Sequence, residues 1–138
     1  MKRLARLLLP IGLLLPVFAA ADCGDTLDAR TRRVVAHPRQ PLAFAPVPTA
    51  PLAVGRHFGL DIEVCPRAAA TMPFALRLEA DMPEHRHGMN YKPTVRALGD
   101  GRWRADGLML HMPGRWRFVF ELSADGRLER LTHEFDLR

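Results

Sequence analysis

Hydrophobic and polar residues alternate along much of the chain after residue 56. The clearest stretch covers residues 57–64, in which Phe58, Leu60, Ile62 and Val64 are separated by single smaller or more polar residues. A period of two places the apolar side chains on one face of an extended chain, which is typical of a half-buried strand. The sequence therefore predicts a strand over residues 57–64.

The same alternation, together with turn signals between the apolar stretches, predicts further strands. Gly99-Asp100-Gly101 and Ala124-Asp125-Gly126 have the composition of tight hairpin turns. No stretch after the first 21 residues has the period of a helix. We therefore predict an all-β domain over residues 57–138, a small antiparallel immunoglobulin-like β-sandwich of about seven strands, with a small barrel as the alternative. The further strands are expected at residues 74–79, 94–98, 102–110, 116–122 and 128–137.

Residues 22–56 do not alternate in this way, and they are rich in proline. Proline lacks a backbone N–H group and fixes one backbone angle, so it interrupts both helices and sheet ladders. We expect residues 22–56 to form an extended N-terminal segment that runs over the surface. The prolines concerned are Pro38, Pro41, Pro46, Pro48 and Pro51.

The first 21 residues have the three parts of a secretory signal peptide. A basic start, Met1 to Arg6, is followed by an apolar stretch that ends in Ala19-Ala20-Ala21. The stretch is short and interrupted compared with a membrane span of about 20 apolar residues. We predict a signal peptide over residues 1–21, cleaved between Ala21 and Asp22. An uncleaved segment that contacts the membrane is the alternative.

Composition indicates the compartment and the class of partner. Arginine outnumbers lysine 18 to 2, which is typical of a GC-rich bacterial gene, so we expect a periplasmic protein. Loss of the signal peptide lowers the formal net charge from +5 to +2, because Lys2, Arg3 and Arg6 leave with it. The remaining charge forms no basic stripe, which argues against nucleic acid as a partner.

The chain beyond the signal peptide contains two cysteines, Cys23 and Cys65. In an oxidising compartment, two cysteines 42 positions apart are most simply paired as a disulfide. Closing such a loop stabilises the folded state by about 3–4 kcal/mol in the chain-entropy model. A pair of thiolate metal ligands is the alternative, although the spacing lacks the Cys-x-x-Cys pattern of redox and zinc motifs.

The densest group of metal-ligating residues is His85, His87 and Met89. In an extended chain, positions i, i+2 and i+4 project from one face in steps of about 6.5–7 Å. In a loop, Gly88 would supply the bend. Thioether sulfur selects copper, above all Cu(I), whereas imidazole binds both Cu(I) and Cu(II). Since zinc rarely uses methionine, the three residues predict a copper site.

A second group, His111 and Met112, precedes Pro113-Gly114, where we expect a strand to end. Within a strand the two side chains would point to opposite faces. A strand end allows both to enter one site, and His111 is the stronger candidate. The predicted metal ligands are His85, His87, Met89, His111 and Met112.

Three neighbouring residues are expected to pack rather than to bind metal. Met109 should lie in the core, and Met82, which precedes a proline, should pack at a strand end. Trp116 should lie in the core or beside the site, because large aromatic residues are mostly buried.

Two motifs together resemble the YtkA-like domain family. They are Met82-Pro83-x-His85-x-His87-Gly88-Met89 and Gly107-Leu108-Met109-Leu110-His111-Met112-Pro113-Gly114-x-Trp116. The resemblance covers roughly residues 58–138. It implies a secreted or membrane-tethered sandwich domain, related to FixH-like accessory proteins and often found beside copper-handling genes. The chain is also similar to periplasmic copper chaperones of the PCuAC type in the interval of 22 positions from Met89 to His111, but it has Leu78 at their upstream ligand position.

These observations predict a periplasmic copper carrier, or metallochaperone. It would pass its ion to a periplasmic or membrane protein such as a copper oxidase, an exporter or an oxidase-assembly factor. We do not expect an enzyme, since Ser123 is the only serine and no Gly-x-Ser-x-Gly motif is present. The alternative is a metal-free interaction module that docks a membrane complex through the sandwich edge.

Overall fold

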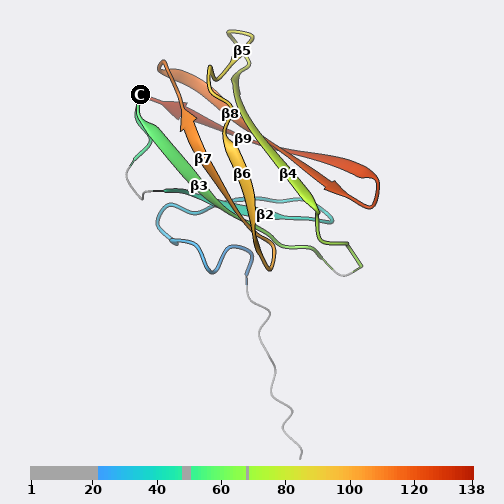
Figure 1. Ribbon diagram of the computed structural model, residues 1–138. Helices are drawn as coiled ribbons and strands as arrows, with labels where there is room; N and C mark the ends of the chain where they lie inside the picture. The colour runs from blue at the N-terminus through green and yellow to red at the C-terminus, as the bar shows by residue number, and fades with distance from the viewer. Residues whose placement is uncertain (1–21, 48–50, 68) are drawn as a thin grey trace, which may run out of the picture.

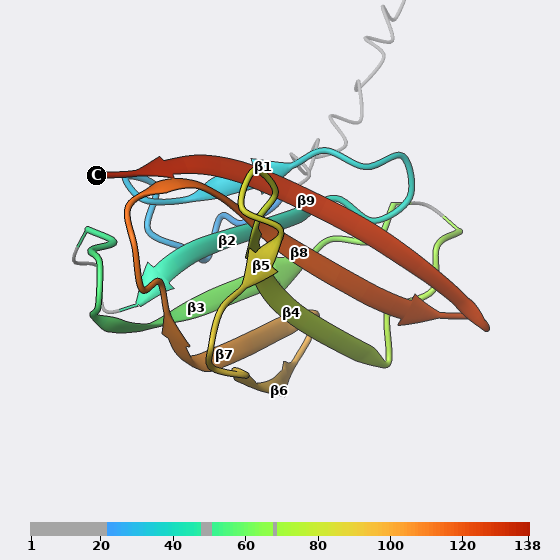
Figure 2. The same ribbon diagram turned by 90° about the horizontal axis from the view of Figure 1, so that it is seen from above.

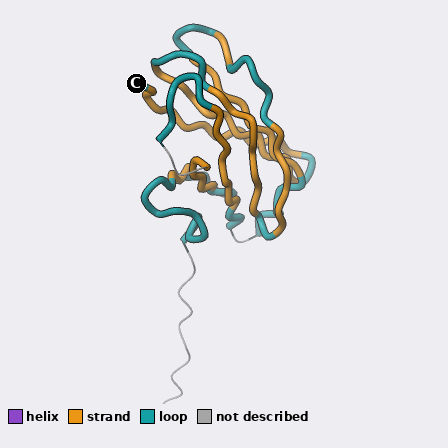
Figure 3. The backbone as a smooth tube through the Cα atoms, turned by 60° about the vertical axis from the view of Figure 1, so that its left-hand side comes forward, coloured by secondary structure: helices purple, strands orange, loops and turns teal. Residues whose placement is uncertain are grey.

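Two antiparallel β-sheets pack face to face in the computed structural model (Figure 1). The structure describes residues 22–47, 51–67 and 69–138. These residues form nine strands and, as Figure 3 shows, no helix. The strands are β1 (Arg33–Val35), β2 (Leu42–Val47), β3 (His57–Val64), β4 (Ala75–Met82), β5 (His87–Gly88), β6 (Thr94–Gly99), β7 (Arg102–Met109), β8 (Gly114–Ala124) and β9 (Arg127–Leu137).

The strand order is that of an immunoglobulin-type sandwich. One sheet has the order β1-β2-β3-β7-β6, and the other has the order β5-β4-β8-β9. Without the short edge strands β1 and β5, four strands face three in the arrangement of a constant-type immunoglobulin domain. The prediction of an all-β, immunoglobulin-like sandwich is therefore confirmed. Figure 2 shows that β1 of the first sheet lies close to β9 of the second.

Strand β2 corrects the prediction made for residues 22–56. It pairs with β3 over its whole length, and Leu42 to Ala45 are all buried. The run does not alternate because both of its faces are covered. One face lies on the core, and the other lies under Gly24, where any side chain would overlap that of Ala43. Residues 33–35 and 42–47 thus both belong to the sandwich. The expectation of a surface segment was wrong for the buried strand 42–47, whereas residues 33–35 form an exposed edge strand.

The inner faces of the two sheets bury one continuous apolar core. Phe44 of β2 lies against Phe118 and Phe120 of β8, with ring centroids 5.7 and 5.1 Å apart. The alternation predicted around residues 74–79 places Leu76 and Leu78 in this core. Phe74 differs from the prediction, because it lies before β4 and is exposed.

A bulge in β7 changes which side chains face the core. The register between β3 and β7 shifts between Phe58 and Leu60, so that Asp106 and Gly107 stand opposite a single residue of β3. Gly107 has a φ of +85°, which glycine adopts at little cost and which is typical of a bulge. As a result Leu108 is buried while Met109 is not part of the core. The prediction that Met109 packs in the core was wrong for this reason.

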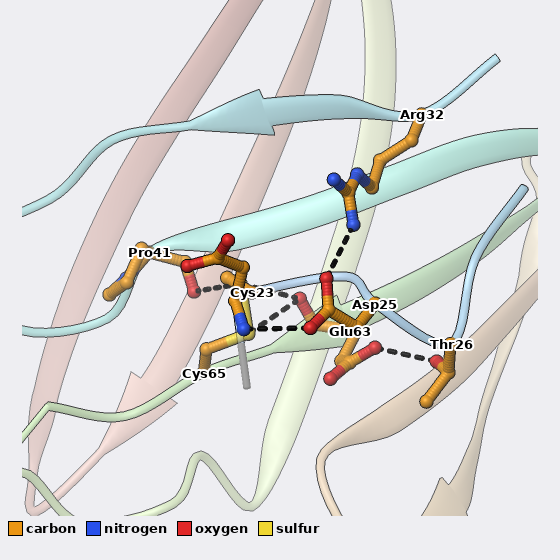
Figure 4. The surroundings of a disulfide bond; sticks show 8 residues. Cys23, Asp25, Thr26, Arg32, Pro41, Glu63 and Cys65 are labelled. Atoms are coloured by element: carbon orange, nitrogen blue, oxygen red, sulfur yellow. Dashed lines mark hydrogen bonds and ion pairs between the residues drawn. A yellow bond between two sulfur atoms is a disulfide. The ribbon is translucent and has the colours of Figure 1, made fainter. Parts of the chain in front are cut away.

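The disulfide predicted between Cys23 and Cys65 is present, with Cα atoms 5.7 Å apart (Figure 4). It joins the N-terminal segment to the residue that follows β3. The backbone N–H of Cys65 donates to the carbonyl of Pro41, 2.9 Å away, and the Thr26 hydroxyl donates to the Glu63 carboxylate at 2.6 Å. The N-terminal segment is therefore held to the β2–β3 pair by both covalent and hydrogen bonds.

Candidate metal centre

His85 and His87 lie in the hairpin that joins β4 to β5, at the top of Figure 1. The backbone N–H groups of His85 and Arg86 both donate to the carbonyl of Met82, at 3.1 and 2.9 Å. Arg86 takes the left-handed conformation, with a φ of +55°, and so provides the bend. The turn lies at residues 83–86, and the expectation that Gly88 supplies the bend was wrong: His87 and Gly88 form β5 and pair with Met82 and Asp81.

The hairpin places His87 on the inner face of its sheet. His87 is the cross-strand partner of Met82, which is fully buried. Cross-strand partners lie on the same face of a sheet, so His87 shares the face of Met82 that looks toward the core. The backbone N–H of Met89 donates to the carbonyl of Ala80 at 2.9 Å, which continues the same pairing. Since Ala80 is also buried, His87 and Met89 lie on one face.

His111 and Met112 lie in the connection between β7 and β8. Strand β7 ends at Met109 and β8 begins at Gly114, so the strand end expected before Pro113 is present. The Trp116 indole N–H donates to the carbonyl of Met112 at 2.9 Å. Because Trp116 is completely buried in β8, this hydrogen bond holds the connection against the end of the core.

The two segments meet at one end of the sandwich. The ring centroid of His87 is 5.2 Å from that of His111 and 5.8 Å from that of His85. Trp116 forms the inner wall, with its ring 5.5 Å from His111 and 6.3 Å from His87, both edge to face. Three imidazoles that lie up to 26 positions apart in the sequence therefore gather beside one indole.

The methionines differ in how far they can take part in a site. Met82 is completely buried, with its methyl group packed against Gly114. That placement fits the packing role expected for it. Met89 and Met112 are partly buried and pack against the outside of the core. Met109, the last residue of β7, is also partly exposed, so accessibility alone does not single out Met89 and Met112.

The carboxylate of Asp81, at the end of β4, is already paired with a cation. Asp81 accepts two hydrogen bonds from Arg117 of β8, at 2.9 and 2.7 Å. These bonds, more than the charge of the carboxylate, raise the pKa of Arg117 above its usual value. The carboxylate of β4 nearest the hairpin is therefore paired with a cation and is not a free metal ligand.

The buried nitrogen of His111 lacks a partner. Its Nδ1 atom is shielded from solvent and makes no hydrogen bond, which is uncommon for a buried polar atom. Within residues 22–47, 51–67 and 69–138, no three side chains of His, Cys, Asp or Glu form a ready-made metal site. A site at this end would therefore combine fewer imidazoles with the partly accessible thioethers, or would draw in the exposed His85 by a change of rotamer.

The contact of Trp116 with both His87 and His111 was not predicted from the sequence. Trp116 was expected only to lie in the core or beside the site. A tryptophan five positions after His111 signals burial, but its contact with His87 depends on the pairing of β4 with β8. That pairing joins Asp81 to Arg117 and Ala75 to Ser123, 36 and 48 positions apart, so local sequence carries no signal for it.

Comparison of the chain with family models, with curated proteins and with solved structures found no match. The resemblance to the YtkA-like family therefore stays a prediction. The predicted signal peptide, residues 1–21, lies outside the described residues. In the part of the chain that is described, no helix has the length and apolarity to cross a membrane.

Proposed function

We propose that this protein is a periplasmic copper carrier that binds one copper ion at the end of the sandwich where His85, His87 and His111 gather. The thioethers of Met89 and Met112 complete the ligand set. The single observation that carries the proposal is the contact between His87 and His111, which come from separate connections and lie 5.2 Å apart.

The spacing of the imidazoles suits a shared ion. With metal–nitrogen bonds of about 2 Å, two imidazoles that bind one ion at a tetrahedral or wider angle have ring centroids about 5–6 Å apart. The separations of 5.2 Å for His87 and His111 and 5.8 Å for His85 and His87 fall within that range. Binding of a metal ion would also give the Nδ1 atom of His111, which has no hydrogen-bond partner, an ion to coordinate.

The surroundings favour Cu(I) over Cu(II). Imidazole and thioether are neutral ligands, and soft sulfur stabilises the monovalent ion. Asp81 is already paired with Arg117, so that carboxylate is not free to offset a second positive charge. Cu(I) also accepts low coordination numbers, so some of these five side chains would be sufficient to hold the ion, although no three His, Cys, Asp or Glu side chains converge among the described residues.

The exposure of the ligands fits a carrier better than a permanent cofactor site. His85 is exposed in the turn, and His87 and His111 are half-buried. A recipient protein can therefore approach from the outside and replace one ligand at a time, as transfer of an ion requires. We propose a copper-receiving periplasmic or membrane protein as the recipient.

Competition for Cu(I) with a chromogenic chelator tests the proposal. We expect one copper per chain, and a loss of affinity of at least 100-fold in the double variant His87→Ala/His111→Ala. The matched control is His57→Ala, because His57 is exposed on β3 and its ring contacts Tyr91 rather than the cluster. A wild-type protein that fails to compete would instead support the metal-free interaction module.

Replacing the two methionines separates the thioether ligands from the imidazoles. Leucine conserves volume but lacks sulfur, so Met89→Leu and Met112→Leu should leave the fold intact. We expect Cu(I) affinity to fall about tenfold or more in at least one of them, while Met109→Leu is unchanged. Equal Cu(I) affinity in all three variants would contradict the thioether part of the proposal.

A further inference from the structure

A cavity, which we call the flank cavity, lies at the side of the sandwich. The edge strands β1 and β9 lie close together on this side (Figure 2). The volume of the cavity is about 520 Å³, within the range of about 300–1,000 Å³ that is typical of small-molecule sites. It is separate from the histidine cluster, since none of His85, His87 and His111 lines it.

The floor of this flank cavity is aromatic and apolar. Phe118 and Phe135 stack with centroids 4.6 Å apart, and Phe44 meets the ring of His133 edge to face at 5.1 Å. Leu52 adds a further apolar wall. The cavity offers an apolar ligand a preformed surface on which its body can be buried, which is the main source of affinity in such sites.

The rim carries a cation that is free to bind an anion. Arg30 is paired with Asp28, and Asp136 is 3.7 Å from Arg115. Arg33 makes no ion pair within the described part of the chain and donates only to backbone carbonyls.

A hydroxyl beside Arg33 lacks a partner. Thr31 lines the cavity, and its Oγ1 is buried without a hydrogen-bond partner, an arrangement that usually costs stability unless another group satisfies the atom. Because this hydroxyl is itself shielded from solvent, the flank cavity combines an apolar lining with a cation at its rim.

The imidazole of His133, which also lines the cavity, lies close enough to Arg33 for the charge of Arg33 to affect its pKa. Burial, and then the nearby charge of Arg33, lower the pKa of His133 below its usual value. The ring is therefore neutral at pH 7 and adds no positive charge of its own. Arg33 supplies the positive potential at this side of the cavity.

From these contacts we infer that the flank cavity binds a small amphipathic carboxylate. The apolar body lies against the partly exposed Phe135 and Leu52, and the carboxylate pairs with the exposed Arg33. The inference is independent of copper, because it involves neither the hairpin nor the β7–β8 connection.

Titration of copper-free protein with octanoate and with 1-octanol, followed by amide chemical shifts, tests the inference. Octanoate should bind at least tenfold more tightly than octanol, with shift changes gathered on β1, β2 and β9. Arg33→Gln should weaken octanoate at least fivefold and leave octanol unchanged. The control Arg130→Gln, on the exposed face of β9, should change neither.

Equal binding of the acid and the alcohol, or insensitivity to Arg33→Gln, would reduce the cavity to a nonspecific apolar surface and overturn the inference. Absence of saturable shifts would do the same.

Discussion

The two ends of the sandwich differ in how firmly they are held. At the end with Cys23 and Cys65, a disulfide and backbone hydrogen bonds fix the chain. At the opposite end, three imidazoles lie close together without hydrogen bonds between them. Strand β3 separates the two ends: Glu63, near the disulfide, pairs with Arg102, and His57 pairs with Met109, two residues before His111. At the first end, the backbone N–H groups of Val64 and Cys65 are both bonded, although the side-chain Oε1 of nearby Gln40 is buried without a partner. At the second, His111 Nδ1 has no partner.

The difference suggests a division between stability and function. Polar groups whose hydrogen bonds are all made within the protein stabilise the fold. A buried polar group without a hydrogen bond is expected mainly at functional sites, where a ligand can become its partner. The disulfide end should therefore control unfolding with little effect on copper. The histidine end should do the reverse, and variants at each end can test this.

The largest expected effect is loss of the disulfide. Cys23→Ser/Cys65→Ser opens a loop of 42 positions, which should cost about 3–4 kcal/mol of unfolding free energy and lower Tm by roughly 10 °C or more. Thermal unfolding under oxidising conditions measures this, with reduced wild type as the control. Copper affinity of the folded variant should stay within threefold of wild type; a larger loss would mean that the two ends are coupled.

A smaller effect is expected at the wall of the histidine cluster. Trp116→Phe removes the donor to the Met112 carbonyl and leaves a cavity, so it should cost about 2 kcal/mol. Urea unfolding measures the cost. Cu(I) affinity should also fall about tenfold, since groups that orient metal ligands contribute on that scale. Unchanged affinity would show that the β7–β8 connection is held without the indole.

The smallest effect on stability is expected at His111 itself. His111→Leu replaces a buried nitrogen that has no hydrogen-bond partner, so the unfolding free energy should rise by about 0.5–1 kcal/mol while copper binding is lost. Denaturant titration beside Cu(I) competition gives both values. A loss of more than about 1 kcal/mol on this substitution would make the imidazole a structural residue and end the proposed division.

Alternation in the sequence predicted the strands that have one covered face, and it failed where both faces are covered. Residues 57–64 form β3 within the predicted bounds. Residues 42–45 form part of β2, but in the sequence they are a short apolar run between prolines. They do not alternate with polar residues because Gly24 covers the outer face of the strand. That cover comes from a segment about 20 positions away, and no local pattern shows it.

The candidate site shows a similar limit. Spacing correctly grouped His85 and His87 and indicated that a strand ends near His111, since both features are local. The contact between His87 and His111 rests on two strand pairings, β5 with β4 and β4 with β8, and on the crossover of the chain from β7 in one sheet to β8 in the other. The wall formed by Trp116 depends on the same pairings, and so it could not be read from the sequence.

The extra residue at Asp106-Gly107 makes this part of the protein sensitive to chain length more than to residue type. Removing one position between Ala105 and Leu108 would exchange inward and outward sides for every side chain up to the turn. Leu108 would leave the interior and Met109 would enter it, and the approach of His111 to the indole would be lost. Natural variants that preserve this corner should therefore conserve the count of residues here even where the residues themselves have changed.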